Sequence, residues 1–121
     1  VFATVGETEV VKEEALDAVT ALTGSGPAYV FYFLEALQEA GIYMGLDDNQ
    51  SLRAALQTVL GSAKLARESD QDPSELRRAV SSPGGTTVEA LQSLDEDAVK
   101  GKVKHAVIQA FRKSRSMGEG E

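Results

Sequence analysis

The chain of 121 residues has no cysteine and no tryptophan, and it contains a single histidine. Without cysteine it can form no disulfide bond, no thiolate metal site and no cysteine nucleophile. The one histidine, His105, has no nearby residues of metal-ligand type, and a lone histidine is usually structural or exposed to solvent. We therefore expect no metal site in this chain.

Long apolar segments and excess positive charge are also missing. The longest apolar run, Ala28 to Leu34, is seven residues long, far short of the roughly 18 residues that span a bilayer. No basic segment followed by an apolar one opens the chain, so we expect no signal peptide and a cytoplasmic location. With 12 basic and 19 acidic residues, the net charge is −7. Such a surface repels phosphate, so neither nucleic acid nor a membrane is an expected partner.

Helical periodicity dominates what is present. Residues 1–11 are short and β-branched around Gly6, which predicts an extended segment or linker. From residue 12 to 121 the pattern is helical, with Ala15, Ala18, Val19 and Leu22 on one face. The hydrophobic content of 42% is enough for one globular domain. The sequence therefore predicts an all-α fold with about six helices.

The predicted helix over residues 27–44 is unusually apolar. Only Glu35, Gln38 and Glu39 are strongly polar in it, and a helix that is apolar nearly all round must be covered on most sides. In a domain of this size, such a helix is either central or covered by a second subunit. We assign Glu35 and Glu39 to its polar stripe.

Helix starts are marked by side chains that can accept hydrogen bonds from free backbone N–H groups. The expected caps are Ser25, either Asp47 (with Gln50) or Asp48, Asp72 with Glu75, and Thr86 with Glu89. Asp95-Glu96-Asp97 is expected to open the last helix, where the helix dipole favours acid. The expected buried faces comprise Leu52, Ala55, Leu56, Val59, Leu60 and Ala63; Val88, Leu91 and Leu94; and Val99, Val103, Ala106, Val107 and Ala110. The tail from Gly118 to Glu121 is expected to fray.

The segment Ser81-Ser82-Pro83-Gly84-Gly85-Thr86-Thr87 carries the clearest functional signal. Its glycines allow the backbone to approach a ligand, and the helix start that follows offers free N–H groups and a positive dipole end to an anion. No lysine follows the glycines, so this is not a Walker loop. A capped helix–helix turn explains the same residues.

A second glycine corner, Thr23-Gly24-Ser25-Gly26-Pro27, lacks the third glycine of a dinucleotide fingerprint and follows a helix rather than a strand. We interpret it as a tight turn between helices.

Two stretches together resemble pyrroline-5-carboxylate reductase. One is Asp17-Ala18-Val19-Thr20-Ala21-Leu22-Thr23-Gly24-Ser25-Gly26-Pro27-Ala28-Tyr29. The other runs from Leu76 to Leu91 and includes the Ser81–Thr87 segment. The likeness extends over about residues 3–116, and the spacing between the two stretches also matches. Asp70 stands where some members carry glutamate.

The resemblance implies an oxidoreductase of proline biosynthesis that reduces 1-pyrroline-5-carboxylate to L-proline with NADPH or NADH. It implies that this chain is the interleaved C-terminal dimerisation domain, assembled as a homodimer and in some members as a ring of dimers. The substrate carboxylate would be held by Ser82, Gly84, Gly85, Thr86 and Thr87. Thr87 matches the threonine that hydrogen-bonds the ring nitrogen, and so is the expected catalytic residue.

The resemblance also implies an N-terminal Rossmann domain that holds the nicotinamide, and none is evident in these residues. We expect residues 1–11 to be the linker from that domain, and the isolated chain to bind no cofactor and to be inactive. The first hypothesis is thus a reductase domain that carries half of the active site, and two alternatives to it remain. One is a non-catalytic helical dimerisation module, and the other is an anion-binding regulator that uses the Pro83–Thr87 loop alone.

Overall fold

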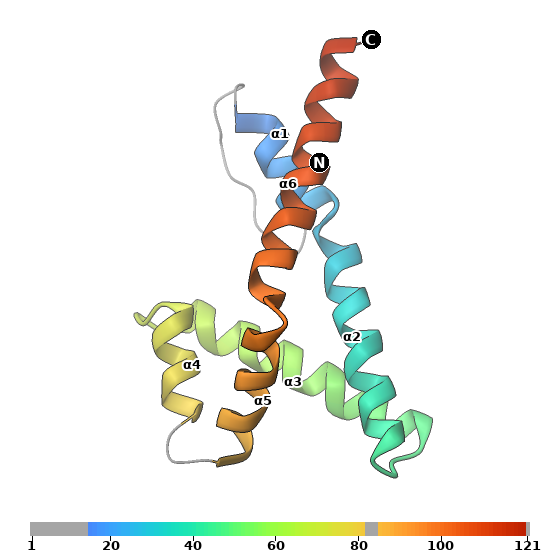
Figure 1. Cartoon of the computed structure of the whole chain (residues 1–121), viewed down its shortest axis with the longest axis vertical. Helices are drawn as coiled ribbons and strands as arrows, with labels where there is room; N and C mark the ends of the chain where they lie inside the picture. Colours follow the sequence, from blue (N-terminus) through green and yellow to red (C-terminus); the bar gives the residue numbers. More distant parts are fainter. Residues whose placement is uncertain (1–14, 82–84, 121) are drawn as a thin grey trace. The chain divides into compact units, whose positions relative to one another are not determined.

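The computed structural model describes residues 15–81 and 85–120. Throughout these residues the fold is helical and contains no strand, which confirms the all-α prediction. The extended segment expected over residues 1–11 lies outside the described residues. In chain order (Figure 1) the elements are α1 (Leu16–Val19), the π-helical turn η2 (Thr20–Gly24), α2 (Gly26–Tyr43), α3 (Asp48–Glu68), α4 (Pro73–Ser81), α5 (Gly85–Glu96) and α6 (Val99–Gly120).

The chain forms two compact units. The first contains the described residues up to Val30 together with those from Ala98 onward. Within it, α1 and η2 pack against α6, and the hydroxyl of Ser114 donates a hydrogen bond of 2.5 Å to Oδ1 of Asp17. Ala21 is only 2% exposed, and the Tyr29 hydroxyl donates to its carbonyl oxygen at 3.0 Å. Tyr29 therefore fastens the start of α2 to η2.

The π-helical turn corrects the expected cap at Ser25. The Thr23 hydroxyl donates to the Val19 carbonyl at 2.8 Å, and the Ser25 N–H donates to the Thr20 carbonyl, five residues earlier, at 3.1 Å. A threonine that bonds back one turn competes with the regular helical ladder. Ser25 has helical dihedral angles (φ −86°, ψ −17°) and not the extended ones of a capping residue. Ser25 therefore joins η2 to α2 with a helical backbone and does not cap α2, so the predicted cap is wrong.

The second unit is Phe31–Asp97, and it begins with the corner between α2 and α3. Gly45, with φ of +111°, allows the turn after α2. The Asp47 carboxylate accepts from the Gln50 N–H at 2.8 Å, and the Gln50 side chain accepts from the Asp47 N–H at 3.1 Å. These two bonds confirm the predicted capping box at the start of α3.

Small residues allow α2 and α3 to meet closely at this corner. Ser51 is 2% exposed, and its hydroxyl donates to the Gln38 carbonyl at 2.7 Å. Gly41 lies against it: a Cβ added at Gly41 would overlap the Ser51 hydroxyl and lie 3.0 Å from its Cβ. Ala55, one turn further along α3, is 5% exposed. The core of the second unit is therefore a contact between small side chains, not a cluster of large ones.

The cap predicted at Asp72 is also present. Its carboxylate accepts from the Ser74 hydroxyl at 2.8 Å and from the Glu75 N–H at 3.2 Å, and the Glu75 side chain accepts from the Asp72 N–H at 2.9 Å. The hydrogen bond from Ser74, followed by that from the Glu75 backbone, lowers the pKa of the Asp72 carboxyl. The cap starts α4, which packs against α5.

The boundaries of the last two helices differ from those expected. α5 continues to Glu96, so Asp95 and Glu96 end one helix and do not begin the next. α6 begins at Val99, after Ala98 with φ of +54°. It runs to Gly120, so the tail expected to fray from Gly118 is helical in its described residues. Acidic residues are favoured at the start of a helix. In this chain, however, the turn at residues 97–98 comes after Asp95 and Glu96, so both lie at the end of α5.

The predicted inward faces are largely uncovered in the single chain. Exposed fractions are 46% for Leu56 and 66% for Leu60 on α3, and 51% for Val88 and 47% for Leu94 on α5. Val103 on α6 is 54% exposed. Among the described residues, only Ala21, Gly41, Ser51 and Ala55 are buried. The helical periodicity was identified correctly, but one chain does not bury the faces that it defines.

Replacing Gly41 with alanine should lower the free energy of unfolding by about 1–3 kcal/mol, the usual cost of an overpacked contact. Gly61→Ala on α3 is the matched control, because its added Cβ would come no closer than 3.7 Å to the Gln57 side chain. This variant should be neutral or more stable by up to about 1 kcal/mol, since alanine favours helix. Urea denaturation at one fixed protein concentration measures both. Equal stability of the two variants would show that the α2–α3 contact is not close.

Ala98→Gly should raise the free energy of unfolding by up to about 1 kcal/mol, because a side chain at positive φ costs roughly 1–2 kcal/mol. Gly45→Ala is the opposite test, since it forces a Cβ onto a residue with φ of +111°, and it should be destabilising. Thermal melts of both variants check the signs. A loss of stability in Ala98→Gly would mean that Ala98 does not have a left-handed conformation in solution.

Candidate functional site

Three of the five residues predicted to bind an anion lie together in the first turn of α5. Gly85 begins the helix, and Thr86 and Thr87 follow it. The first N–H groups of a helix have no carbonyl one turn earlier to accept their hydrogen bonds, and they lie at the positive end of the helix dipole. This turn therefore has the geometry of an anion site. Ser82 and Gly84, the other two predicted residues, lie outside the described residues.

The two threonines differ in their surroundings. Thr86 is exposed, whereas Thr87 is half-buried. The expected capping box between Thr86 and Glu89 is wrong, because α5 already begins at Gly85 and Thr86 lies within its first turn. Both threonines lie in the first turn of α5, so their backbone N–H groups are at the positive end of the helix dipole.

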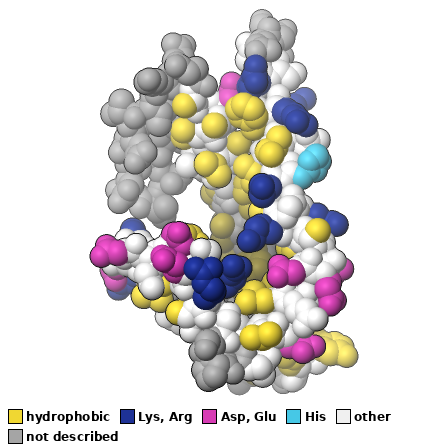
Figure 2. Space-filling model, turned by 60° about the vertical axis from the view of Figure 1, so that its left-hand side comes forward, with side chains coloured by type: hydrophobic (Ala, Val, Ile, Leu, Met, Phe, Trp, Pro, Cys, Tyr) yellow, Lys and Arg dark blue, Asp and Glu magenta, His cyan; other side chains and the backbone are white. Residues whose placement is uncertain are grey.

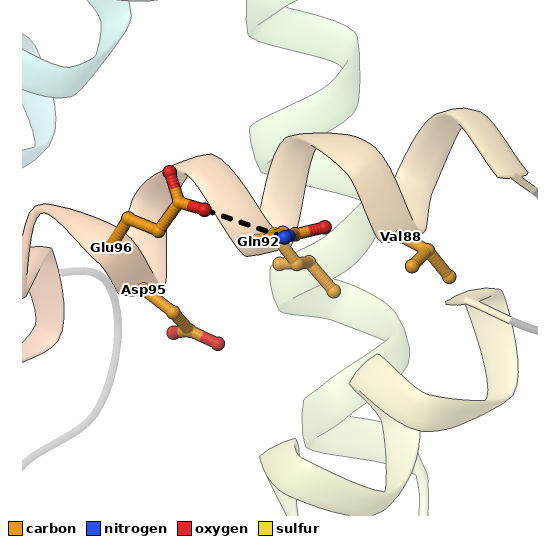
Figure 3. A pocket seen from close by; sticks show the side chains of 5 residues that line it. Val88, Gln92, Asp95 and Glu96 are labelled. Atoms are coloured by element: carbon orange, nitrogen blue, oxygen red, sulfur yellow. Dashed lines mark hydrogen bonds between the residues drawn. The ribbon is translucent and has the colours of Figure 1, made fainter.

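A shallow hollow lies farther along α5. It is lined by Val88, Leu91, Gln92, Asp95 and Glu96 (Figure 3). In this view Gln92 and Glu96 point toward each other, and a hydrogen bond of 3.3 Å joins their side chains. The two carboxylates make the hollow unsuitable for an anion. α5 thus offers N–H groups at its start and acidic side chains at its end.

The glycine corner at residues 23–27 is not a nucleotide site. Gly24 ends η2, Gly26 begins α2, and no strand precedes them in the part of the chain that the structure describes. A dinucleotide pyrophosphate is held by a strand, a glycine turn and a helix, so these residues do not fit the nicotinamide cofactor. The predicted turn between helices lies close to the observed junction between η2 and α2.

The described residues show neither a cluster of metal-binding side chains nor a helix that is long and apolar enough to cross a membrane. His105 is exposed on α6 (cyan in Figure 2), as expected for a lone histidine.

A second candidate surface is the exposed apolar surface of α2. Exposed fractions reach 61% for Phe31, 77% for Tyr32 and 54% for Phe33, and 91% for Tyr43 at the end of the helix. Hydrophobic side chains are also visible among charged ones on the face shown in Figure 2. Large uncovered apolar surfaces mark interaction sites. The sequence indicated that this helix needs a cover but not where the cover comes from, because burial by the chain itself and burial by a partner give the same pattern.

The family model for pyrroline-5-carboxylate reductase dimerisation matches residues 13–117. The match covers most of the chain, and the chain belongs to this family of dimerisation domains. The family relationship agrees with a helical fold that leaves large apolar side chains uncovered in a single copy.

Curated relatives carry the name pyrroline-5-carboxylate reductase. The protein of Methanosarcina acetivorans is 41% identical over 98% of this chain and 44% of its own length. That of Aquifex aeolicus is 46% identical over 88% of this chain and 40% of its own length. The chain therefore spans less than half the length of these relatives.

Solved structures of reductases have the same fold. The chain matches the Plasmodium falciparum pyrroline carboxylate reductase, a crystal structure with NADP bound, with a TM-score of 0.89 and 41% identity. The match covers 93% of this chain and 43% of that one. The enzyme of Streptococcus pyogenes matches with a TM-score of 0.88 and 38% identity, over 92% of this chain and 43% of that one.

Proposed function

We propose that this chain is the C-terminal part of a pyrroline-5-carboxylate reductase, an enzyme that reduces 1-pyrroline-5-carboxylate to L-proline with NADPH or NADH. The observation that carries the proposal is the match over residues 13–117 to the dimerisation family of these reductases. The start of α5 supports it, because the substrate is a carboxylate and a helix start favours an anion.

In this proposal the first turn of α5 and the loop before it hold the substrate carboxylate. Ser82, Gly84, Gly85 and Thr86 surround the carboxylate, and Thr87 contacts the ring. Reduction of the C=N bond places a hydride on carbon and requires a proton on nitrogen. The Thr87 hydroxyl donates a hydrogen bond to that nitrogen and orients the ring, which makes Thr87 the proposed catalytic residue.

The nicotinamide supplies the hydride when it is bound, and we assign its binding to a Rossmann domain outside these 121 residues. Residues 1–11 are the proposed linker from that domain, and residues 12–121 form the dimerisation and substrate-binding domain. The described residues support this division because none of them forms a strand that could precede a pyrophosphate-binding turn.

The proposed assembly is a homodimer, and a ring of dimers is the larger assembly that such dimers can form. The exposed aromatic residues of α2 support it, since apolar area contributes about 25 cal/mol per Å² when it is removed from water. A second copy offers the same apolar surface in return, as a two-fold interface requires.

Thr87→Ala in a full-length reductase that carries this domain should lower kcat/KM by about 10- to 1000-fold, the scale of one lost transition-state hydrogen bond. Thr86→Ala is the matched control: it removes the same atoms from the neighbouring residue but keeps the backbone N–H. Because Thr86 is exposed and does not cap α5, this change should alter stability by less than about 0.5 kcal/mol and leave most of the activity.

Steady-state kinetics and thermal melts of both variants decide the role of Thr87. Inhibition by proline should persist in Thr87→Ala, because the backbone N–H groups that hold the carboxylate remain. Full activity of Thr87→Ala would mean that the nitrogen receives its proton from elsewhere. A complete reductase with no activity on pyrroline-5-carboxylate would instead favour a non-catalytic dimerisation module.

Tyr32→Asp should raise the dissociation constant of the dimer by at least about 100-fold, since it places an unpaired charge in an apolar interface. Asn49→Asp, at an exposed polar position of α3, adds the same charge outside the aromatic surface and should leave the dimer intact. Sedimentation equilibrium and circular dichroism measure assembly and helicity. A Tyr32→Asp dimer as tight as that of the unaltered chain would rule out the α2 surface as the interface.

A further inference from the structure

The last residue of α4 is held by its own side chain. The hydroxyl of Ser81 donates a hydrogen bond of 2.6 Å to the carbonyl oxygen of Arg77, one turn earlier in the helix. This distance lies at the short end of the usual range for two oxygen atoms, and Ser81 is half-buried. Helix ends fray readily. The bond therefore ties the end of α4 to the turn before it.

Only three residues separate this helix end from the proposed anion-binding turn. α4 ends at Ser81 and α5 begins at Gly85, and the two helices pack against each other. Each residue of a chain spans at most about 3.6 Å, so a connection of this length has little slack. A displacement of the end of α4 is therefore transmitted to the first turn of α5.

The residues that are half-buried in α4 and α5 include one on each side of this connection. In α4 they are Leu76, Arg77 and Ser81, and in α5 they are Thr87 and Leu91. All other residues of the two helices are exposed. Ser81 and Thr87 are thus the covered residues nearest the connection. The Ser81 hydroxyl already donates its proton within α4, which suits it to holding the chain and not to protonating a substrate.

We propose that Ser81 is a positioning residue for the substrate carboxylate. Its bond to Arg77 fixes the point at which the chain leaves α4, and the short connection then sets the place of the backbone N–H groups at the start of α5. Ser81 acts through the first turn of α5 and does not itself contact the ring. This role rests on the proposed reductase function and adds a residue that determines how tightly the substrate is held.

Steady-state kinetics of a full-length reductase that carries this domain test the role. Ser81→Ala should raise the KM for pyrroline-5-carboxylate by about fivefold or more and leave kcat within about twofold, the pattern of lost binding rather than lost chemistry. The inhibition constant of proline should rise by a similar factor, because the product's carboxylate uses the same turn.

Two further variants at the same position test whether the hydrogen bond carries the effect. Ser81→Thr keeps a hydroxyl that can bond to a carbonyl one turn earlier, so its KM should lie within about twofold of that of the unaltered enzyme. Ser81→Cys keeps the size of the side chain but offers a weaker donor. Its KM should lie between those of the serine and alanine enzymes.

Thr58→Ala is the matched control. The Thr58 hydroxyl donates to the Ala54 carbonyl, also one turn earlier, at 2.8 Å. The change removes the same kind of bond from α3, a helix that neither precedes nor follows the connection. It should leave the KM and the inhibition by proline unaltered. Circular dichroism and thermal melts of all variants check that the helices remain folded.

The role of Ser81 is wrong if Ser81→Ala keeps the KM and the proline inhibition of the unaltered enzyme, or if Thr58→Ala shifts them equally. It is also wrong if Ser81→Thr is impaired as strongly as Ser81→Ala, or if Ser81→Ala lowers kcat while KM stays the same. An unaltered full-length reductase with no activity on pyrroline-5-carboxylate would instead overturn the proposed function itself.

Discussion

The fold depends on apolar surface that one chain cannot cover. In the described residues of a single copy, only small residues are buried: Ala21, Gly41, Ser51 and Ala55. Phe31, Tyr32 and Phe33 on α2 remain more than half exposed. Ordering each residue of a chain costs roughly 1–2 kcal/mol of backbone entropy, and apolar burial is the main term that offsets it. In the proposed homodimer, a second copy supplies the cover that the helices need.

Local hydrogen bonds fix where the helical segments begin and how neighbouring segments meet. The capping boxes at Asp47 and Asp72 fix where α3 and α4 begin. The close contact of Gly41 with Ser51 sets the corner between α2 and α3, and Tyr29 ties α2 to η2. The first turn of α5 follows α4 along the chain. The local contacts that position these helices therefore also determine where the proposed substrate loop lies.

The sequence predicted the features that depend on interactions between residues close together in the chain. Helical periodicity and both carboxylate caps follow from side chains within a few residues of one another. The π-helical turn at Thr20–Gly24 was missed, because a back-bonded threonine does not alter the apolar period. The end of α5 was misplaced, because Asp95-Glu96-Asp97 has the composition of a helix start. The expected buried faces were correct as stripes, but a pattern of apolar residues does not say whether the cover comes from the same chain. The resemblance supplied the proposed role of Thr87. The spacing of these residues alone is explained equally well by a turn.

Concentration-dependent unfolding tests most directly whether folding and dimerisation are one event. Urea denaturation of the unaltered chain would be followed by circular dichroism, with sedimentation on the same samples, over about a hundredfold range of protein concentration. If a second copy covers the apolar faces, helicity and dimer are lost together, and the midpoint rises with concentration. A midpoint independent of concentration, with a helical monomer below it, would contradict the account.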